Sequence, residues 1–89
     1  LALRAPNIQE RQRTGLTDGL YVESVASRSP AVRAELKAGD FILQVRGRAI
    51  RLVADFREGV ETAAAEGVPV AVLTLRGEER RFIALELDR

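Results

Sequence analysis

The chain has 89 residues, 46% of them hydrophobic, with one Tyr, three Phe, and 14 Lys and Arg against 13 Asp and Glu. It contains no Cys and no His, which excludes disulfides, Cys-ligated metal sites and the general base that most often activates a nucleophilic Ser. The net charge of +1 lacks the basic excess of a nucleic-acid-binding protein, and no apolar run is long enough to span a membrane. The length fits a single domain, residues 1–89, and the absence of Met indicates that it comes from a longer protein. Without His and Cys, we expect no metal, no cofactor and no catalytic residues in this domain.

Short strands and one short helix are predicted for the first half of the chain. Residues 1–4 form a short alternating stretch, and residues 5–18 are polar and irregular, with several turn-forming residues. The runs at 20–25 and 41–45 predict strands. Between them, Ser29 can cap the first N–H groups of a helix and Pro30 suits its first position, so a short helix is expected to begin there.

A longer helix and a hairpin are predicted for the second half. Gly67 ends a stretch at 52–66 in which apolar residues share one helical face: Val53, Phe56, Val60 and Ala64. Strands follow at 70–75 and 81–87, joined by a tight turn. This order of elements indicates an α+β fold, a small and partly open β-barrel or sandwich of about five strands capped by two helices.

Three motifs lie in the stretch GLYVESVASRSPAVRAELKAGDFILQVRG, residues 19–47. Residues 19–25 follow the pattern G-φ-x-V-x-x-V, residues 29–36 follow S-P-A-x-x-A-G-L with one change, and residues 39–47 follow G-D-x-I-L-x-V-N-G with one change. Together they resemble the PDZ domains that follow the protease domain in bacterial HtrA/Deg-family serine proteases. The resemblance implies the permuted bacterial topology, in which the groove-lining strand comes first and the strand at 82–87 comes last.

Three positions depart from the family pattern. Glu35 stands where the family has Gly after the short helix, and Arg46 stands where it has Asn before Gly47. Gly and Asn tolerate a positive φ, which Glu and Arg adopt only with strain. The third position is Ala2, which replaces a Gly of the carboxylate-binding loop in the stretch Leu-Ala-Leu at residues 1–3.

The resemblance implies a peptide-binding groove between residues 1–4 and the helix at 52–66, where an extended peptide adds as a strand. Main-chain hydrogen bonds would give affinity, side-chain pockets would give specificity, and a nest of loop N–H groups would hold a terminal carboxylate. On the helix, positions three or four residues apart face the groove. The expected peptide-binding residues are Leu1, Ala2, Leu3, Arg4, Val53, Arg57, Val60 and Glu61.

Several of these residues have a second interpretation. Leu1 and Leu3 either floor the peptide pocket or pack in the core, and Arg4 either receives the ligand carboxylate or is a solvated surface charge. Arg57 either reads an acidic ligand residue or is an ordinary surface Arg. The resemblance assigns Asp40 a structural role, in which its side chain accepts local backbone N–H groups.

As a function, the resemblance implies a peptide-binding PDZ module that recruits or senses unfolded or C-terminal peptide segments for a linked HtrA/Deg-type serine protease. It also implies protein quality control in the bacterial periplasm or cell envelope, and a homo-oligomeric parent protein. Two alternatives stay open. One is a docking PDZ domain of another envelope protein, such as a site-2 metalloprotease, a C-terminal processing protease or a secretion component. The other is a scaffold domain with a closed groove that serves oligomer assembly.

Overall fold

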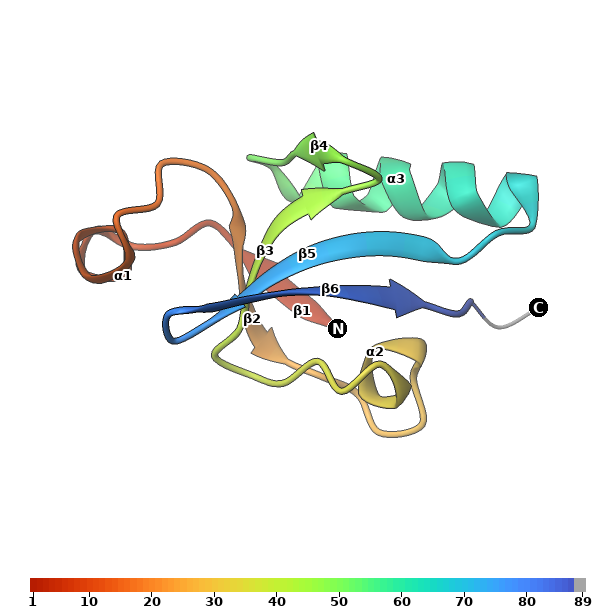
Figure 1. The fold of residues 1–89 in the computed structure, drawn as a ribbon, viewed down its shortest axis with the longest axis horizontal. Coiled ribbons are helices and arrows are strands. Elements are labelled where there is room, and N and C mark those ends of the chain that lie inside the picture. The colour runs from red at the N-terminus through yellow and green to blue at the C-terminus, as the bar shows by residue number, and fades with distance from the viewer. Residues whose placement is uncertain (88–89) are drawn as a thin grey trace.

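The structure is a computed structural model that describes residues 1–87 (Figure 1). Its elements, in chain order, are β1 (Ala2–Arg4), α1 (Ile8–Thr14), β2 (Leu20–Ser24), α2 (Pro30–Arg33), β3 (Phe41–Val45), β4 (Arg48–Ala49), α3 (Val53–Glu66), β5 (Val70–Arg76) and β6 (Glu79–Leu85). The described strands form one antiparallel sheet in the order β1-β2-β3-β5-β6, and β4 pairs with β3 beside this path. The strands β1 and β6 are therefore the two edges of the sheet.

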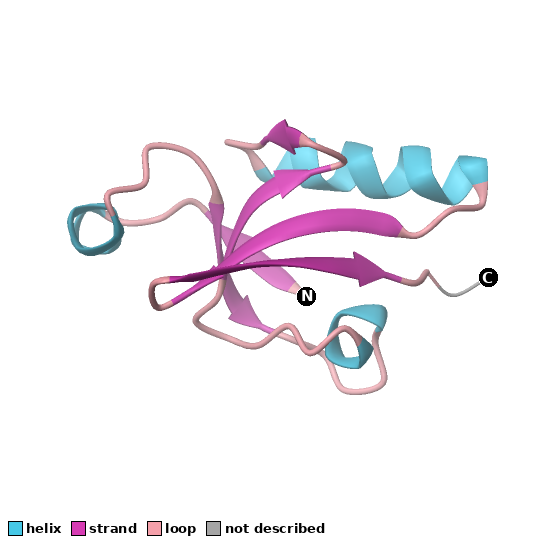
Figure 2. Ribbon diagram, viewed as in Figure 1, coloured by secondary structure: helices cyan, strands magenta, loops and turns pink. Residues whose placement is uncertain are grey.

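Two helices lie on opposite sides of the curved strands, and the third stands apart. Figure 2 shows α3 on one side, α2 on the other, and α1 at one end of the molecule. This confirms the α+β architecture that the sequence predicts. Residues 1–87 contain six strands and three helices, and α1 is additional to the two helices that the sequence predicts.

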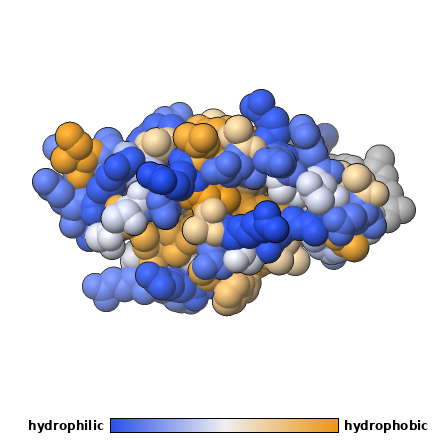
Figure 3. Space-filling model, turned by 90° about the horizontal axis from the view of Figure 1, so that it is seen from above, coloured by the Kyte–Doolittle hydropathy of each residue, from blue (hydrophilic) through white to orange (hydrophobic). Residues whose placement is uncertain are grey.

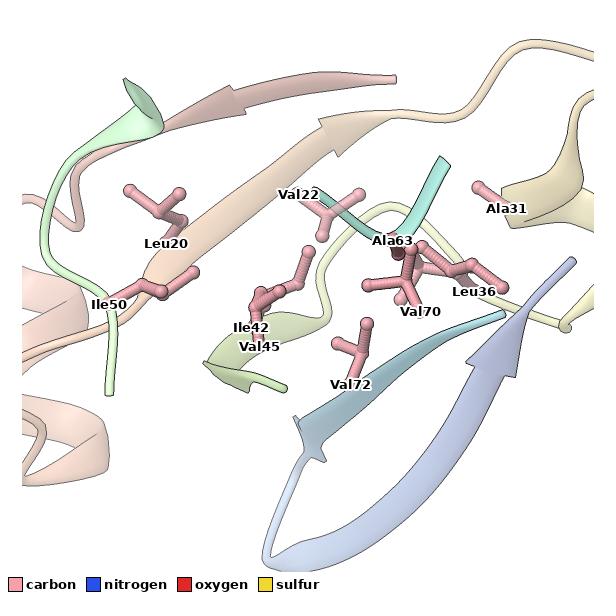
Figure 4. Close-up of a cluster of buried hydrophobic side chains, with 11 residues drawn as sticks. Leu20, Val22, Ala31, Leu36, Ile42, Val45, Ile50, Ala63, Val70 and Val72 are labelled. Atoms are coloured by element: carbon pink, nitrogen blue, oxygen red, sulfur yellow. The ribbon is translucent and has the colours of Figure 1, made fainter. Parts of the chain in front are cut away.

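The main core is built from aliphatic side chains of the sheet, α2 and α3, which point toward one another in Figure 4. It consists of Leu20, Val22, Ala31, Leu36, Ile42, Val45, Ile50, Ala63, Val70, Val72 and Leu85. A smaller cluster of Phe41, Leu43 and Leu75 packs separately, and the ring of Phe41 meets that of Tyr21 edge to face at 5.3 Å between centroids. The few aromatic side chains thus leave the main core to aliphatic packing, as the composition predicts.

The helix α3 is turned slightly from the phase that its apolar pattern predicts. Phe56 and Val60 pack against the main core, as expected. Its buried residue, however, is Ala63, while Ala64 and Val53 are exposed. The reason is that the small side chain of Ala63 lets the helix approach the sheet, so burial follows the closest contact rather than the hydrophobicity of each residue.

The segment 5–18, predicted to be irregular, contains α1. This seven-residue helix has a single buried residue, Glu10, and so lacks the apolar stripe that marks a helix in a sequence. The two-residue strand β4 was also not predicted. The last strand spans Glu79–Leu85 instead of 81–87, because the two-residue turn at Gly77 lets pairing with β5 begin at Glu79.

The two unusual turn residues do have positive φ. Glu35 has φ 66° and Arg46 has φ 56°, followed by Gly47 at 80°. Each strained position lies beside an arginine contact: Arg76 donates to the Glu35 carbonyl at 2.8 Å, and Arg46 pairs with Glu66 at 3.1 Å. These contacts fix turns whose residues would otherwise avoid that conformation.

Asp40 is buried and has the structural role that the resemblance implies. Its carboxylate accepts the Lys37 N–H at 2.9 Å and two hydrogen bonds from Arg76, at 2.8 and 2.9 Å. Burial disfavours the charged form of Asp40, but these hydrogen bonds outweigh burial and hold its pKa below the usual value. Arg76 thereby joins the end of β5 to the turn that precedes β3.

We expect Asp40→Asn to lower the free energy of unfolding by about 2–3 kcal/mol, because it leaves the Arg76 guanidinium without its buried partner. Arg76 is partly exposed and can be resolvated, which keeps the loss below that of a fully buried pair. Urea denaturation at neutral pH measures the loss. The matched control is Glu79→Gln, which removes an exposed ion pair at 3.8 Å and should change stability by less than about 1 kcal/mol. Equal effects of the two variants would contradict the structural role of Asp40.

We expect Gly59→Ala to destabilise the protein, although Ala favours helices over Gly by about 1 kcal/mol. A Cβ at Gly59 would lie 2.5 Å from Cγ1 of the buried Val45, so α3 must move away from β3. Such overpacking typically costs about 1–3 kcal/mol. Thermal and urea denaturation check the sign, with Glu58→Ala on the exposed face of α3 as the control. A higher midpoint for Gly59→Ala would show that the helix tolerates the methyl group.

Candidate functional site

The strand β1 offers a free backbone edge. In residues 1–87 it pairs with β2 alone, in the register Ala2↔Ser24, Leu3↔Val22 and Arg4↔Tyr21, with an irregularity between Ala2 and Leu3. Its other side carries N–H and C=O groups that no strand of the described chain pairs. Such an edge can accept an extended peptide as an additional strand.

The side chains of β1 divide between surface and core. Leu1, just before the strand, is 41% exposed. Ala2 and Leu3 are half-buried, and Leu3 packs against the main core. Leu3 therefore packs in the core, whereas Leu1 lies exposed at the surface beside the free edge.

The predicted residues of α3 also divide. Val60 is half-buried and packs against the same core cluster as Leu3. Val53, Arg57 and Glu61 are exposed. Among the described residues, no ion pair engages the side chains of Arg57 and Glu61. Figure 3 shows hydrophobic surface in the middle of one face, bordered by hydrophilic residues.

Arg4 is already engaged on three sides. Its guanidinium donates to both carboxylate oxygens of Glu10, at 2.7 and 2.9 Å, and its Nε lies 2.7 Å from Glu23. The same group stacks over the ring of Tyr21, 4.2 Å from the centroid. Through these partners Arg4 ties β1 to Glu10 of α1 and to Glu23 of β2.

Glu10 is the residue of this site that sequence reasoning missed. Its buried carboxylate accepts from Arg4 and also from the Asn7 N–H at 2.9 Å, while the Asn7 side chain accepts from the Glu10 N–H at 2.8 Å. The hydrogen bonds from Arg4, opposed by burial and aided by the Asn7 N–H, lower the pKa of Glu10 from 4.5 to about 2. The signal in the sequence was Asn7 with Glu three residues later, the pattern of a capping box.

A separate cavity of about 370 Å³ lies between α3 and the β3–β4 hairpin. It is lined by Val45, Arg46, Arg48, Ala49, Ile50, Asp55, Glu58, Gly59 and Thr62, none of which was predicted to bind peptide. Within the described part of the chain, no group of acidic residues is arranged to hold a metal ion. No helix there combines the length and apolar character needed to cross a membrane.

Comparison with known proteins gives consistent matches. A family model described as "PDZ domain" matches residues 8–87. The chain is 34% identical over 67 residues to the putative serine protease HhoB of Synechocystis sp. and 35% identical over 74 residues to the serine protease Do-like HtrA of Bacillus subtilis. These alignments cover 75% and 83% of this chain but only 16% of each relative, so the chain spans a small part of their length.

The fold is also that of a solved structure, the HtrA3 PDZ domain bound to a phage-derived ligand, Phe-Gly-Arg-Trp-Val. The TM-score is 0.79 at 23% sequence identity, over 97% of this chain and 79% of the other. At this identity the likeness concerns the fold. It confirms the architecture that the motifs at residues 19–47 predict.

We expect Glu10→Gln to remove part of the acid sensitivity of this protein. Because the pKa of Glu10 is lower in the folded chain than in the unfolded one, its stabilising effect is present above about pH 4.5 and is lost as the pH falls towards about 2. The variant should be less stable than the wild type at neutral pH, and the difference should shrink over this range. Urea midpoints at several pH values measure it, with the exposed Glu58→Gln as control. A difference that stays constant with pH would contradict the Arg4–Glu10 pairing.

Proposed function

This chain belongs to the PDZ domain family, and from that premise we propose that it binds extended peptides along β1, opposite α3, as the recognition module of a longer protease. The observation that carries the proposal is the free outer edge of β1. We take Leu3 and Val60, which pack against the same core cluster, as the apolar floor of the groove. The phage-derived ligand of the HtrA3 PDZ domain, a short peptide ending in Val, supports the same kind of partner.

In this proposal the backbone of β1 supplies affinity and the surrounding side chains supply selectivity. The peptide pairs with the unpaired N–H and C=O groups of β1 and sets its apolar side chains against Leu1 and the floor beneath it. Arg57 and Glu61, four residues apart on exposed positions of α3, favour peptides that carry charged residues at the matching places. Arg4 and Ala2 contribute through their backbone groups, since the guanidinium of Arg4 is already paired.

The proposal extends to the parent protein. Residues 1–89 act as one non-catalytic PDZ module, and a linked HtrA-type serine endopeptidase performs the cleavage. The two curated relatives are bacterial and named as serine proteases, which supports this setting. The module would deliver unfolded or C-terminal segments to a homo-oligomeric quality-control protease of the periplasm or cell envelope.

The test is an NMR titration of the 89-residue chain with the peptide Phe-Gly-Arg-Trp-Val. We expect a dissociation constant of roughly 10–100 μM, because a short peptide loses conformational freedom and buries few side chains. Shift changes should concentrate on residues 1–4 and on 53–61, and amidation of the peptide terminus should weaken binding. Shift changes centred on residues 46–51 or on the Gly77 turn would contradict binding in the groove and would indicate a docking surface at those residues instead. No response to this peptide or to others with apolar ends would sink the proposal.

Leu1→Asp provides the matched mutation. Leu1 is exposed, so the variant should fold normally, yet it places a charge beside the apolar part of the peptide and should raise the dissociation constant about tenfold. The control is Val32→Asp on α2, where the replaced side chain is equally exposed at 41% but is not one of the proposed peptide-binding residues. If both variants bind as the wild type does, Leu1 is not part of the groove.

A further inference from the structure

We infer that Glu10 is a positioning residue for the peptide site: through Arg4 it couples α1 to β1 and so sets how well the groove strand is ordered before a ligand arrives. The inference rests on the proposed function for its binding consequence, but the coupling itself is a property of the free protein. Neither the family match, which begins at residue 8, nor the motifs at 19–47 include the two residues that form the link together.

The helix α1 has little else to hold it. It contains seven residues, too few for a helix that is stable alone, and Glu10 is its one buried residue. Ile8 in its first turn is 75% exposed, and Figure 1 shows the helix set apart from α2 and α3. The attachment of α1 to the sheet therefore depends strongly on the contact between Glu10 and Arg4.

The strand β1 has the corresponding weakness. It contains three residues, its pairing with β2 shifts register between Ala2 and Leu3, and its outer side is unpaired. Short edge segments near a chain end open more readily than the rest of a fold. Arg4, at the inner end of this strand, is the residue through which β1 is fastened to both α1 and β2.

The Glu10 carboxylate both pairs with Arg4 of β1 and accepts the backbone N–H that caps α1. Oε1 of Glu10 accepts from Arg4 at 2.7 Å and from the Asn7 N–H at 2.9 Å, while Oε2 accepts from Arg4 at 2.9 Å. The forked guanidinium and the planar carboxylate thus meet in a bidentate pair that fixes orientation as well as distance. Fraying of the α1 N-terminus would disturb the Arg4 contact, and movement of β1 would disturb the helix cap.

The fraction of molecules in which β1 is ordered sets the apparent affinity for peptide. A peptide can add only to a β1 strand that is in place, so its apparent dissociation constant rises as the ordered fraction of β1 falls. The other ion pair of Arg4, to Glu23, ties β1 only to its neighbouring strand β2, and Glu23 is half-exposed. Glu10 is buried and lies on a different element. We therefore assign the larger part of the ordering to Glu10.

Glu10→Gln separates the link from the helix cap. Gln at this position of a capping box can still accept the Asn7 N–H, but its amide offers Arg4 no bidentate carboxylate. Glu23→Gln is the matched control, since it removes the other carboxylate partner of Arg4 and leaves α1 untouched. The readouts are amide hydrogen exchange of β1 and α1 in the free 89-residue chain, and the affinity for Phe-Gly-Arg-Trp-Val.

We expect Glu10→Gln to speed exchange in β1 and α1 together, and by a larger factor than the loss of global stability speeds it in β3 and β5. It should also weaken peptide binding roughly three- to tenfold. Glu23→Gln should change both readouts less than about twofold. Arg4→Lys, which keeps the charge but not the fork, should behave like Glu10→Gln and serves as the test if that variant does not fold.

Three outcomes would overturn the inference. One is faster exchange in α1 with β1 unchanged, another is unaltered peptide affinity in Glu10→Gln, and the third is an equal effect of Glu23→Gln. A wild-type chain that binds no peptide would sink the proposed function instead, and the exchange measurements on the free protein would still decide whether Glu10 orders β1.

Discussion

The free edge of β1 is the constraint on which the proposed peptide site depends. A strand that is to accept a peptide must leave one row of N–H and C=O groups unpaired, so it cannot gain order from hydrogen bonds on both sides. With three residues and one neighbour, β1 needs another anchor. The side chain of Arg4 supplies it through Glu10, Glu23 and the ring of Tyr21. The Arg4 charge therefore serves to hold the β1 backbone in place.

The same use of arginine recurs at two turn residues with positive φ. Arg76 joins buried Asp40 to the carbonyl of Glu35, a residue with positive φ, and Arg46, also at positive φ, pairs with Glu66. A chain with four aromatic rings and an aliphatic core has few bulky side chains with which to brace its turns. Guanidinium groups brace them instead, because several donors in a rigid fork can reach carboxylates and carbonyls together.

Much of the framework could be predicted because it rests on local signals. Strands β2, β3 and β5 follow from their apolar runs. Helix α2 follows from Ser29, whose side chain caps its N-terminus, and from Pro30, which begins the helix. The helix α1 escaped prediction because its buried residue is charged: periodicity of apolar residues cannot reveal a helix that the fold holds by an ion pair. For the site, the sequence indicated β1 and α3 but could not tell that Leu3 turns to the core while Leu1 remains exposed.

The sequence by itself determined the family, the element order and the absence of His and Cys chemistry, since these depend on residue types and on contacts close along the chain. Only the tertiary structure decided which charges are free. Arg4 and Arg57 look alike in the sequence, yet Arg4 meets Glu10 after the chain turns into α1, whereas Arg57 lies exposed on α3. The physical reason is that a charge pair forms where the folded backbone brings two groups within hydrogen-bond reach, and that proximity is a property of the whole fold.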